Sequence, residues 1–163
     1  GLSKSVQMID YVGNGGSIAL GNHGAAVRCL EYLRGTEHDG LFSGSWDETL
    51  KQWDHRASTF LTKTINLPGK VYTMDLKGSY LIVGCSGRNV TIFDLRNTSK
   101  PLQTRESSLK HQTRCIKMMP NLAGFVLSSV EGRVAVEYID MSAESQSRKY
   151  AFKCHRQADL IHP

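Results

Sequence analysis

Short runs of β-branched, aliphatic and aromatic residues follow one another along the chain, each only a few residues long. Clusters of Gly, Asn, Ser and Asp separate them, for example at residues 13–16 and 84–87. No stretch keeps a helical apolar period over three turns. The pattern therefore predicts an all-β fold of short strands and turns. The clearest runs are residues 41–43, 71–75, 81–83, 90–93, 124–127, 133–138 and 150–153.

Apolar runs that end in a similar way recur at a nearly fixed distance along the chain. Apolar runs close on Asp10, Asp54 and Asp94, which lie 44 and 40 residues apart, and a less regular one closes at Tyr138 or Asp140, 44 or 46 residues further on. A period in this range is typical of four-stranded propeller blades. We therefore expect one β-propeller domain, with the end of a blade in 1–10, blades in 11–54, 55–94 and 95–140, and a loop with the first strand of the next blade in 141–163.

The number of blades bears on the length of the protein. Propellers close with at least four blades and commonly with about seven, and about seven blades of this size need roughly 300 residues. The 163 residues hold only about three to four. We expect missing segments, or a parent chain about twice this length, with both ends of the sequence lying inside the repeat array.

One segment makes the propeller type specific. Residues 44–54, GSWDETLKQWD, resemble a WD repeat. The resemblance implies a buried hydrogen-bonded tetrad of His23, Ser43, Asp47 and Trp53. In it Asp47 accepts from the imidazole, the imidazole binds the Ser43 hydroxyl, and that hydroxyl accepts from the indole, so each buried polar group has a partner. A catalytic His23–Asp47 pair is the weaker interpretation, because the structural role already accounts for the spacing.

The next repeat departs from this pattern. Gly87 stands at the aspartate position and Phe93 at the tryptophan position. The tetrad is therefore expected to be absent there, and that blade should depend on apolar packing.

Charge is distributed unevenly. The formal net charge is +5; residues 1–81 carry 8 basic and 8 acidic side chains, whereas residues 82–163 carry 12 and 7. An acidic or phosphorylated partner for the second half fits this excess. Direct nucleic-acid binding has less support, because no dense run of Lys and Arg exists. A hydrophobic content of 40% excludes wholesale disorder, and no apolar stretch is long enough for a membrane helix.

The cysteines indicate no metal site. Cys29, Cys85, Cys115 and Cys154 form no CxxC pair, so structural zinc is not expected, and each lies in or beside an apolar run that favours a buried free thiol. Cys154 and His155 are adjacent, so in a strand their side chains point to opposite faces and cannot act as a catalytic pair. We therefore expect no enzyme activity, no metal and no cofactor.

Three long segments resemble one WD-repeat family. They are RESSLKHQTRCI at 105–116, SSVEGRVAVEY at 128–138 and KYAFKCHR at 149–156. The family is the Bub-type propeller of the spindle assembly checkpoint, and its near relative is the messenger-RNA export propeller of the nuclear pore. The similarity continues through 44–54 and 71–96 and covers most of the chain from about residue 20. His111 departs from the checkpoint pattern, where Tyr is usual, and is more similar to the export propeller.

The resemblance implies a non-catalytic scaffold of mitosis, found in the nucleus, at kinetochores in mitosis and in the cytoplasm. Its implied partners are the GLEBS motifs of checkpoint kinases and pseudokinases, and phosphorylated MELT repeats of a kinetochore scaffold. The alternative is an export propeller that binds a nucleoporin GLEBS motif. No membrane partner is implied.

Four residues match the binding positions of the family. Trp46 and Arg114 match GLEBS contacts, and an exposed tryptophan in a turn and an arginine suit a peptide carrying acidic residues. Arg133 and Lys153 match phosphothreonine contacts, and we expect them to converge from adjacent blades on one phosphate. The alternatives are a loop-packing role for Trp46 and ordinary solvated charges for the other three.

Overall fold

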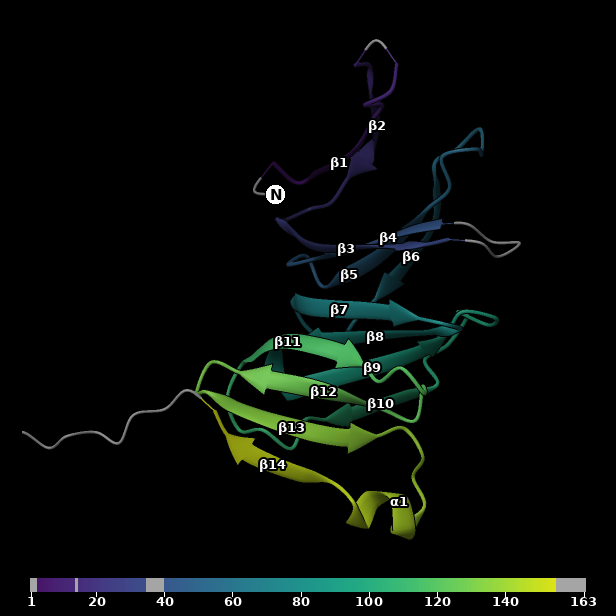
Figure 1. The fold of residues 1–163 in the computed structure, drawn as a ribbon. Helices are drawn as coiled ribbons and strands as arrows, with labels where there is room; N and C mark the ends of the chain where they lie inside the picture. The colour runs from purple at the N-terminus through teal and green to yellow at the C-terminus, as the bar shows by residue number, and fades with distance from the viewer. Residues whose placement is uncertain (1–2, 14, 35–39, 155–163) are drawn as a thin grey trace, which may run out of the picture.

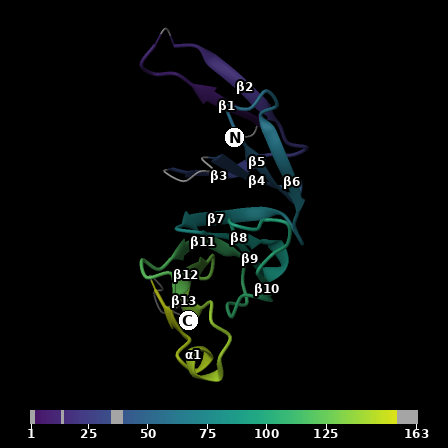
Figure 2. The same ribbon diagram turned by 90° about the vertical axis from the view of Figure 1, so that its right-hand side faces the viewer.

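The computed structural model describes residues 3–13, 15–34 and 40–154, and nearly all of its regular structure is β. The described residues form four antiparallel sheets that follow one another in chain order, with β1 and β2 at one end of the stack and β14 and α1 at the other (Figures 1 and 2). This is the architecture of a partial WD-repeat propeller, as the strand pattern and the period predicted.

The first sheet has two strands and the other three have four each. The first holds β1 (Ser5–Ile9) and β2 (Ser17–Asn22), and the second holds β3 (Val27–Leu33), β4 (Gly40–Ser45), β5 (Thr49–Trp53) and β6 (Leu61–Asn66). The third holds β7 (Val71–Lys77), β8 (Tyr80–Cys85), β9 (Asn89–Asp94) and β10 (Gln103–Glu106). The fourth holds β11 (Thr113–Met118), β12 (Gly124–Ser129), β13 (Arg133–Tyr138) and β14 (Tyr150–Lys153).

The sheets are displaced from the sequence repeats by one strand, which corrects the expected blade limits. β2 lies inside the repeat at 11–54 but pairs with β1, and β6 lies in the repeat at 55–94 but pairs with β5. The strand expected to open the next blade, β14, is instead the fourth strand beside β13. The reason is local: antiparallel strands joined by a loop pair with each other, so the chain after each closing aspartate returns to the strand it has just left.

The sheets pack face to face through apolar side chains. One core cluster joins the second and third sheets and includes Phe42, Leu50 and Phe93; another joins the third and fourth and includes Ile92, Ile116 and Phe125. The strands β3, β7 and β11 also contact one another in that order. In each of the three four-stranded sheets, the first strand therefore lies on the same side of the stack.

All seven apolar runs named from the sequence lie within strands. The strands that those runs left out are mostly polar or half-buried: β6 reads LTKTIN and β10 reads QTRE, and exposed residues alternate with half-buried ones along both. The five-residue helix α1 (Ala143–Ser147) begins at Ser142, whose side chain accepts from the Ser145 N–H. So short a helix carries no apolar period, and the sequence pattern could not reveal it.

The thiol expectation holds only in part. Cys85 is buried, and burial raises the pKa of its thiol to about 12, which favours the inert thiol form. Cys115 is exposed, because it lies on an outward-facing position of β11. No helix among the described residues is long and apolar enough to cross a membrane.

Candidate functional site

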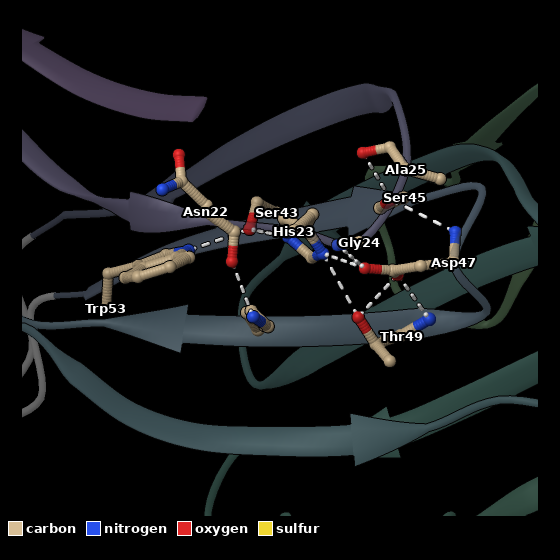
Figure 3. Close-up of polar contacts among 10 residues, drawn as sticks. Asn22, His23, Gly24, Ala25, Ser43, Ser45, Asp47, Thr49 and Trp53 are labelled. Atoms are coloured by element: carbon tan, nitrogen blue, oxygen red, sulfur yellow. Dashed lines mark hydrogen bonds and ion pairs between the residues drawn. The ribbon is translucent and has the colours of Figure 1, made fainter. Parts of the chain in front are cut away.

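His23, Ser43, Asp47 and Trp53 form a continuous hydrogen-bonded chain through the second sheet (Figure 3). The Trp53 indole N–H donates to Ser43 Oγ at 2.7 Å, and Ser43 Oγ lies 2.7 Å from His23 Nε2. His23 Nδ1 lies 3.0 Å from Asp47 Oδ2. For every donor to have an acceptor, the imidazole must carry its proton on Nδ1, with Nε2 accepting from the serine hydroxyl.

A fifth side chain, Thr49, completes this network. Its hydroxyl donates to Asp47 Oδ1 at 2.6 Å and also lies 3.0 Å from His23 Nδ1. The Gly24 N–H donates to the other carboxylate oxygen at 2.7 Å. With both oxygens and the imidazole occupied in this way, the His23–Asp47 pair has a structural role and leaves no free base for catalysis.

The network sets the charges of its members. Burial lowers the pKa of His23, and the hydrogen bond that the ring donates to Asp47 only partly opposes this, so the ring is neutral near pH 7. Burial alone would raise the pKa of Asp47, but hydrogen bonds from Thr49, Gly24 and His23 lower it to about 2. The folded sheet therefore needs a neutral imidazole and a charged carboxylate.

This requirement predicts two steps of acid destabilisation. The unfolded chain binds a proton on His23 below a pH of about 6.5 more readily than the folded chain does, so stability should fall as the pH drops from about 6.5. Asp47 should add a second loss between about pH 4 and 2, because its folded pKa is the lower one. Urea unfolding measured from pH 8 to 3 checks both steps. His23→Gln should remove the first step and Asp47→Asn the second, and a wild type of constant stability between pH 7 and 5 would contradict the assignment.

In the third sheet, apolar side chains occupy the positions of this polar network. Leu67, Val83 and Phe93 belong to one buried cluster there, at the positions that correspond to His23, Ser43 and Trp53. Gly87 takes the aspartate position in the turn η1 (Ser86–Arg88), with φ at +69°. The expected change to apolar packing in this blade is confirmed.

Trp46 lies in the turn between β4 and β5, and 43% of its surface is exposed. Its backbone N–H donates to Ala26 O at 3.0 Å. The same bond recurs in the next two sheets, from Ser86 to Lys70 at 2.8 Å and from Val130 to Gln112 at 2.9 Å. These three turns are therefore equivalent, and all lie at the end of the sheets where β3, β7 and β11 begin.

Arg114 lies in a β-bulge, and this feature also recurs in the three sheets. The bulge comes two residues after the residue whose carbonyl accepts the hydrogen bond, which is Ala26, Lys70 or Gln112. The register shifts between Thr113 and Cys115 on β11, and equivalent shifts leave Arg28 on β3 and Tyr72 on β7 without a cross-strand partner. Arg28 and Arg114 are exposed and Tyr72 is half-buried. Bulges re-aim the extra side chain, so these three equivalent positions form a row across neighbouring strands, next to the Trp46 turn.

The sequence named only one of these three residues as a contact. Arg28 and Tyr72 are not among the contacts predicted from the sequence. The signal for Arg28 was present, because the dipeptide Arg-Cys occurs at 28–29 and again at 114–115. Two equal dipeptides at equivalent points of a repeat indicate equivalent backbone positions.

Arg133 and Lys153 lie directly opposite each other on β13 and β14. Paired antiparallel residues share a face of the sheet, so the two cations are neighbours within one blade. This corrects the expectation that they converge from adjacent blades, and its cause is the pairing of β14 with β13. The apolar run at 150–153 is not buried, since all four residues of β14 are exposed at the sheet edge. His155 and Arg156, the next basic residues of the sequence, lie outside the described residues.

A pocket of about 330 Å³ opens beside Arg133. It lies between the connector from β10 to β11 and the β13–β14 hairpin, and its polar lining includes Ser108, Lys110, His111, Glu131 and Arg133. Glu131 Oε2 lies 3.2 Å from His111 Nε2, and Glu131 Oε1 lies 3.5 Å from Arg133 Nε. The pocket thus combines several basic side chains with one carboxylate.

A buried carboxylate holds the connector that lines this pocket. Glu137 on β13 is 1% exposed and accepts from the Ser108 N–H at 2.9 Å and the Ser108 hydroxyl at 2.8 Å. Arg105 on β10 lies 3.9 Å from the same carboxylate and donates to Tyr138 O at 2.8 Å. Sequence reasoning missed this pair, although a glutamate inside the apolar run VAVEY already indicated a buried partner.

No group of three or more His, Cys, Asp or Glu residues among the described residues has the arrangement of a metal site. The arrangements that the structure does provide are surfaces: an aromatic and basic row at the bulges, and a basic pocket at Arg133. Both suit the binding of an acidic or phosphorylated segment.

Comparison with known proteins identifies the kind of propeller. No protein-family model matches the chain. It is 49% identical over 152 residues to the mitotic checkpoint protein BUB3.1 of Arabidopsis thaliana, covering 88% of the chain and 44% of the relative. It is 41% identical to the mitotic checkpoint protein bub-3 of Caenorhabditis elegans, over 100% of the chain and 49% of the relative. It is also 36% identical to the WD40 repeat protein poxJ of Penicillium oxalicum, over 94% of the chain and 44% of the relative, which agrees with the WD-repeat propeller architecture of its sheets.

The chain is also 34% identical to the mRNA export factor GLE2 of Chaetomium thermophilum, over 96% of the chain and 43% of the relative. Similarity to both groups agrees with the Bub-type and export propellers named from the motifs. The chain spans about half the length of the curated relatives it matches.

Proposed function

We propose that this chain is part of a non-catalytic scaffold of the mitotic spindle assembly checkpoint. The observation that carries the proposal is the direct pairing of Arg133 with Lys153 beside a basic pocket, in a chain similar to mitotic checkpoint proteins. The proposed partners are GLEBS motifs of checkpoint kinases and pseudokinases, and phosphorylated MELT repeats of a kinetochore scaffold. The proposed location is the nucleus and the cytoplasm, with kinetochores in mitosis.

The pocket supports the phosphate half of this proposal. A phosphothreonine carries a charge of about −1.5 to −2 near pH 7. Arg133 and exposed Lys110 line the pocket, and Lys153 lies opposite Arg133 on the same face of the β13–β14 pair. So small a group of cations at one cavity fits a single dianion better than an extended polyanion such as RNA.

The bulge row supports the GLEBS half. Exposed Arg28 and Arg114 lie at equivalent points on two inner strands, with Tyr72 on the strand between them. Half-exposed Trp46 lies in the neighbouring turn. An aromatic anchor beside separated arginines suits a peptide that presents acidic side chains at intervals. In this proposal Arg28 joins Trp46 and Arg114 as a contact.

The second candidate is messenger-RNA export through a nucleoporin GLEBS motif. The observations that favour it are the similarity to GLE2 and the histidine at position 111. The two functions share a GLEBS surface but differ at the pocket, since only the checkpoint function requires a phosphothreonine site.

The test is a titration of the full-length protein with a MELT peptide that carries phosphothreonine or plain threonine, with a checkpoint-kinase GLEBS peptide bound beforehand. We expect only the phosphopeptide to bind. The double variant Arg133→Ala, Lys153→Ala should lose at least tenfold in phosphopeptide affinity, because it removes two charge-assisted contacts. It should keep its affinity for GLEBS.

The matched control is Arg114→Ala, which should weaken GLEBS binding and leave the phosphopeptide affinity unchanged when GLEBS is absent. The checkpoint proposal is overturned in favour of export if the folded wild type binds neither form of the MELT peptide and binds a nucleoporin GLEBS peptide more tightly than a checkpoint-kinase GLEBS peptide.

A further inference from the structure

The carboxylate of Glu131 occupies an unexpected position in the pocket. The repeated hydrogen bonds to Ala26 and Gln112 make Trp46 equivalent to Val130, so the next residue, Asp47, is equivalent to Glu131. In the second sheet that acid is held by a buried imidazole, a threonine and a backbone N–H. The fourth sheet therefore keeps an acid at the tetrad position.

The two side chains that hold the acid in the second sheet are replaced in the fourth sheet. The position of His23 is taken there by Leu109, which is 3% exposed, and the position of Thr49 is taken by Arg133. The side chain of Leu109 can donate no hydrogen bond. Glu131 instead lies between His111 and Arg133 and lines the pocket with both. An acid that serves the fold in one blade is thus placed at a basic pocket in another.

The contact with Arg133 is a loose one. The two atoms are 3.5 Å apart, and Arg133 Nε is buried but makes no hydrogen bond. A carboxylate that served to orient the guanidinium would be expected to make the short parallel hydrogen bonds of a fork-like pair. A loose pair supplies charge at the pocket without fixing the side chain, and it leaves the guanidinium with unused hydrogen-bonding capacity.

We propose that Glu131 is an internal competitor for the anion that this pocket binds, a proposal that rests on the pocket being the phosphate site proposed above. Its carboxylate opposes the positive charge of Lys110, Arg133 and Lys153. An incoming phosphate must enter beside this negative charge or displace it from Arg133. Glu131 therefore limits phosphate affinity and keeps binding of the modified peptide reversible.

The competition also affects selectivity between anions. The electrostatic gain from removing a fixed negative charge grows with the charge of the ligand. A phosphate with a charge near −2 should gain about twice as much binding free energy as a carboxylate with a charge of −1. The fold-change in affinity for the phosphate should then be the square of the fold-change for the carboxylate. Removal of the Glu131 charge should thus favour the phosphopeptide over a peptide with glutamate in its place.

The experiment compares wild type with Glu131→Gln in the full-length protein. The probes are a phosphothreonine MELT peptide, the same peptide with glutamate at that position, and inorganic phosphate. Glu131→Gln should tighten the phosphothreonine peptide about tenfold and the glutamate peptide about threefold. The control is Glu144→Gln in α1, which makes the same change in net charge beyond the other end of β13 and should change neither affinity measurably.

The outcomes separate the inference from the proposed function. If the wild type binds the phosphopeptide and Glu131→Gln binds it equally or less tightly, the inference is wrong while the phosphate site stands. If Glu131→Gln gains affinity for inorganic phosphate but neither protein prefers the phosphopeptide over the glutamate peptide, the competitor stands and the MELT assignment is wrong. If neither protein binds any of the three probes, both proposals fail.

Discussion

Trp53→Ala is expected to lower the free energy of unfolding by about 4 kcal/mol, the cost of removing a large buried aromatic side chain. Trp53 is 1% exposed and packs with Val6, Leu20 and Val27, so it joins the first sheet to the second. The backbone of the first sheet fits closely against the indole: a Cβ added at Gly21 would lie 2.7 Å from a ring carbon of Trp53. The alanine variant therefore leaves a cavity and removes the hydrogen bond that Ser43 Oγ accepts.

Trp53→Phe separates these two effects. It retains most of the ring but removes the N–H that donates to Ser43 Oγ, so it should cost clearly less than alanine, about 2 kcal/mol. Urea denaturation of wild type and both variants measures the difference. Equal losses for the two variants would show that the hydrogen bond, not the packing, dominates; a loss below 1 kcal/mol for alanine would contradict the role of Trp53 altogether.

Asp75→Ala is expected to cost about 2 kcal/mol, because this residue joins the third sheet to the fourth. Asp75 on β7 is 7% exposed and accepts from the Met118 N–H on β11 at 2.7 Å. Its other oxygen forms an ion pair with Lys117, which also lies 3.9 Å from Glu31 on β3. The alanine variant leaves the buried Met118 N–H unpaired and removes one of the polar links between β7 and β11, another being the hydrogen bond from Ile116 N–H to Thr73 Oγ1. The expected loss of stability is small for a partly buried ion pair, because the exposed Lys117 side chain can be hydrated when Asp75 is absent.

Asp75→Asn is the informative control for this second prediction. An amide oxygen can still accept from the Met118 N–H, while the ion pair with Lys117 is lost, so the asparagine variant should be destabilised by about half as much. Urea denaturation at low and at high salt checks the division, since only the ion-pair part should weaken with salt. If the two variants are equally destabilised, the backbone hydrogen bond contributes nothing.

The tetrad illustrates what the sequence can reveal. Its residue types and spacing are those of a WD repeat, and a chain of four polar groups satisfies itself in only a few arrangements. The same reasoning identified Phe93 and Gly87 as its apolar replacement in the next blade. Local patterns of this kind are readable because each depends on residues within one repeat.

The pocket shows what the sequence could not reveal. That Arg133 and Lys153 lie opposite each other depends on the pairing of β14 with β13 across a loop that holds α1. That Glu131 lies between His111 and Arg133 depends on the path of a connector fixed by Glu137. No repeat motif specifies these contacts, and periodicity within a strand carries no information about them.

The one-strand displacement between repeats and sheets has a consequence for dividing this protein. The sequence repeat and the hydrogen-bonded sheet have different limits, because each repeat supplies the last strand of the sheet before it. A cut at the repeat limit after Asp54 would strip β6 from β5 and leave an open sheet edge, a surface prone to pairing with other chains. A cut in the short link between Asn66 and Val71 would keep both neighbouring sheets whole. Autonomous fragments, chimaeras and circular permutants of this propeller should therefore be designed on sheets and not on repeats.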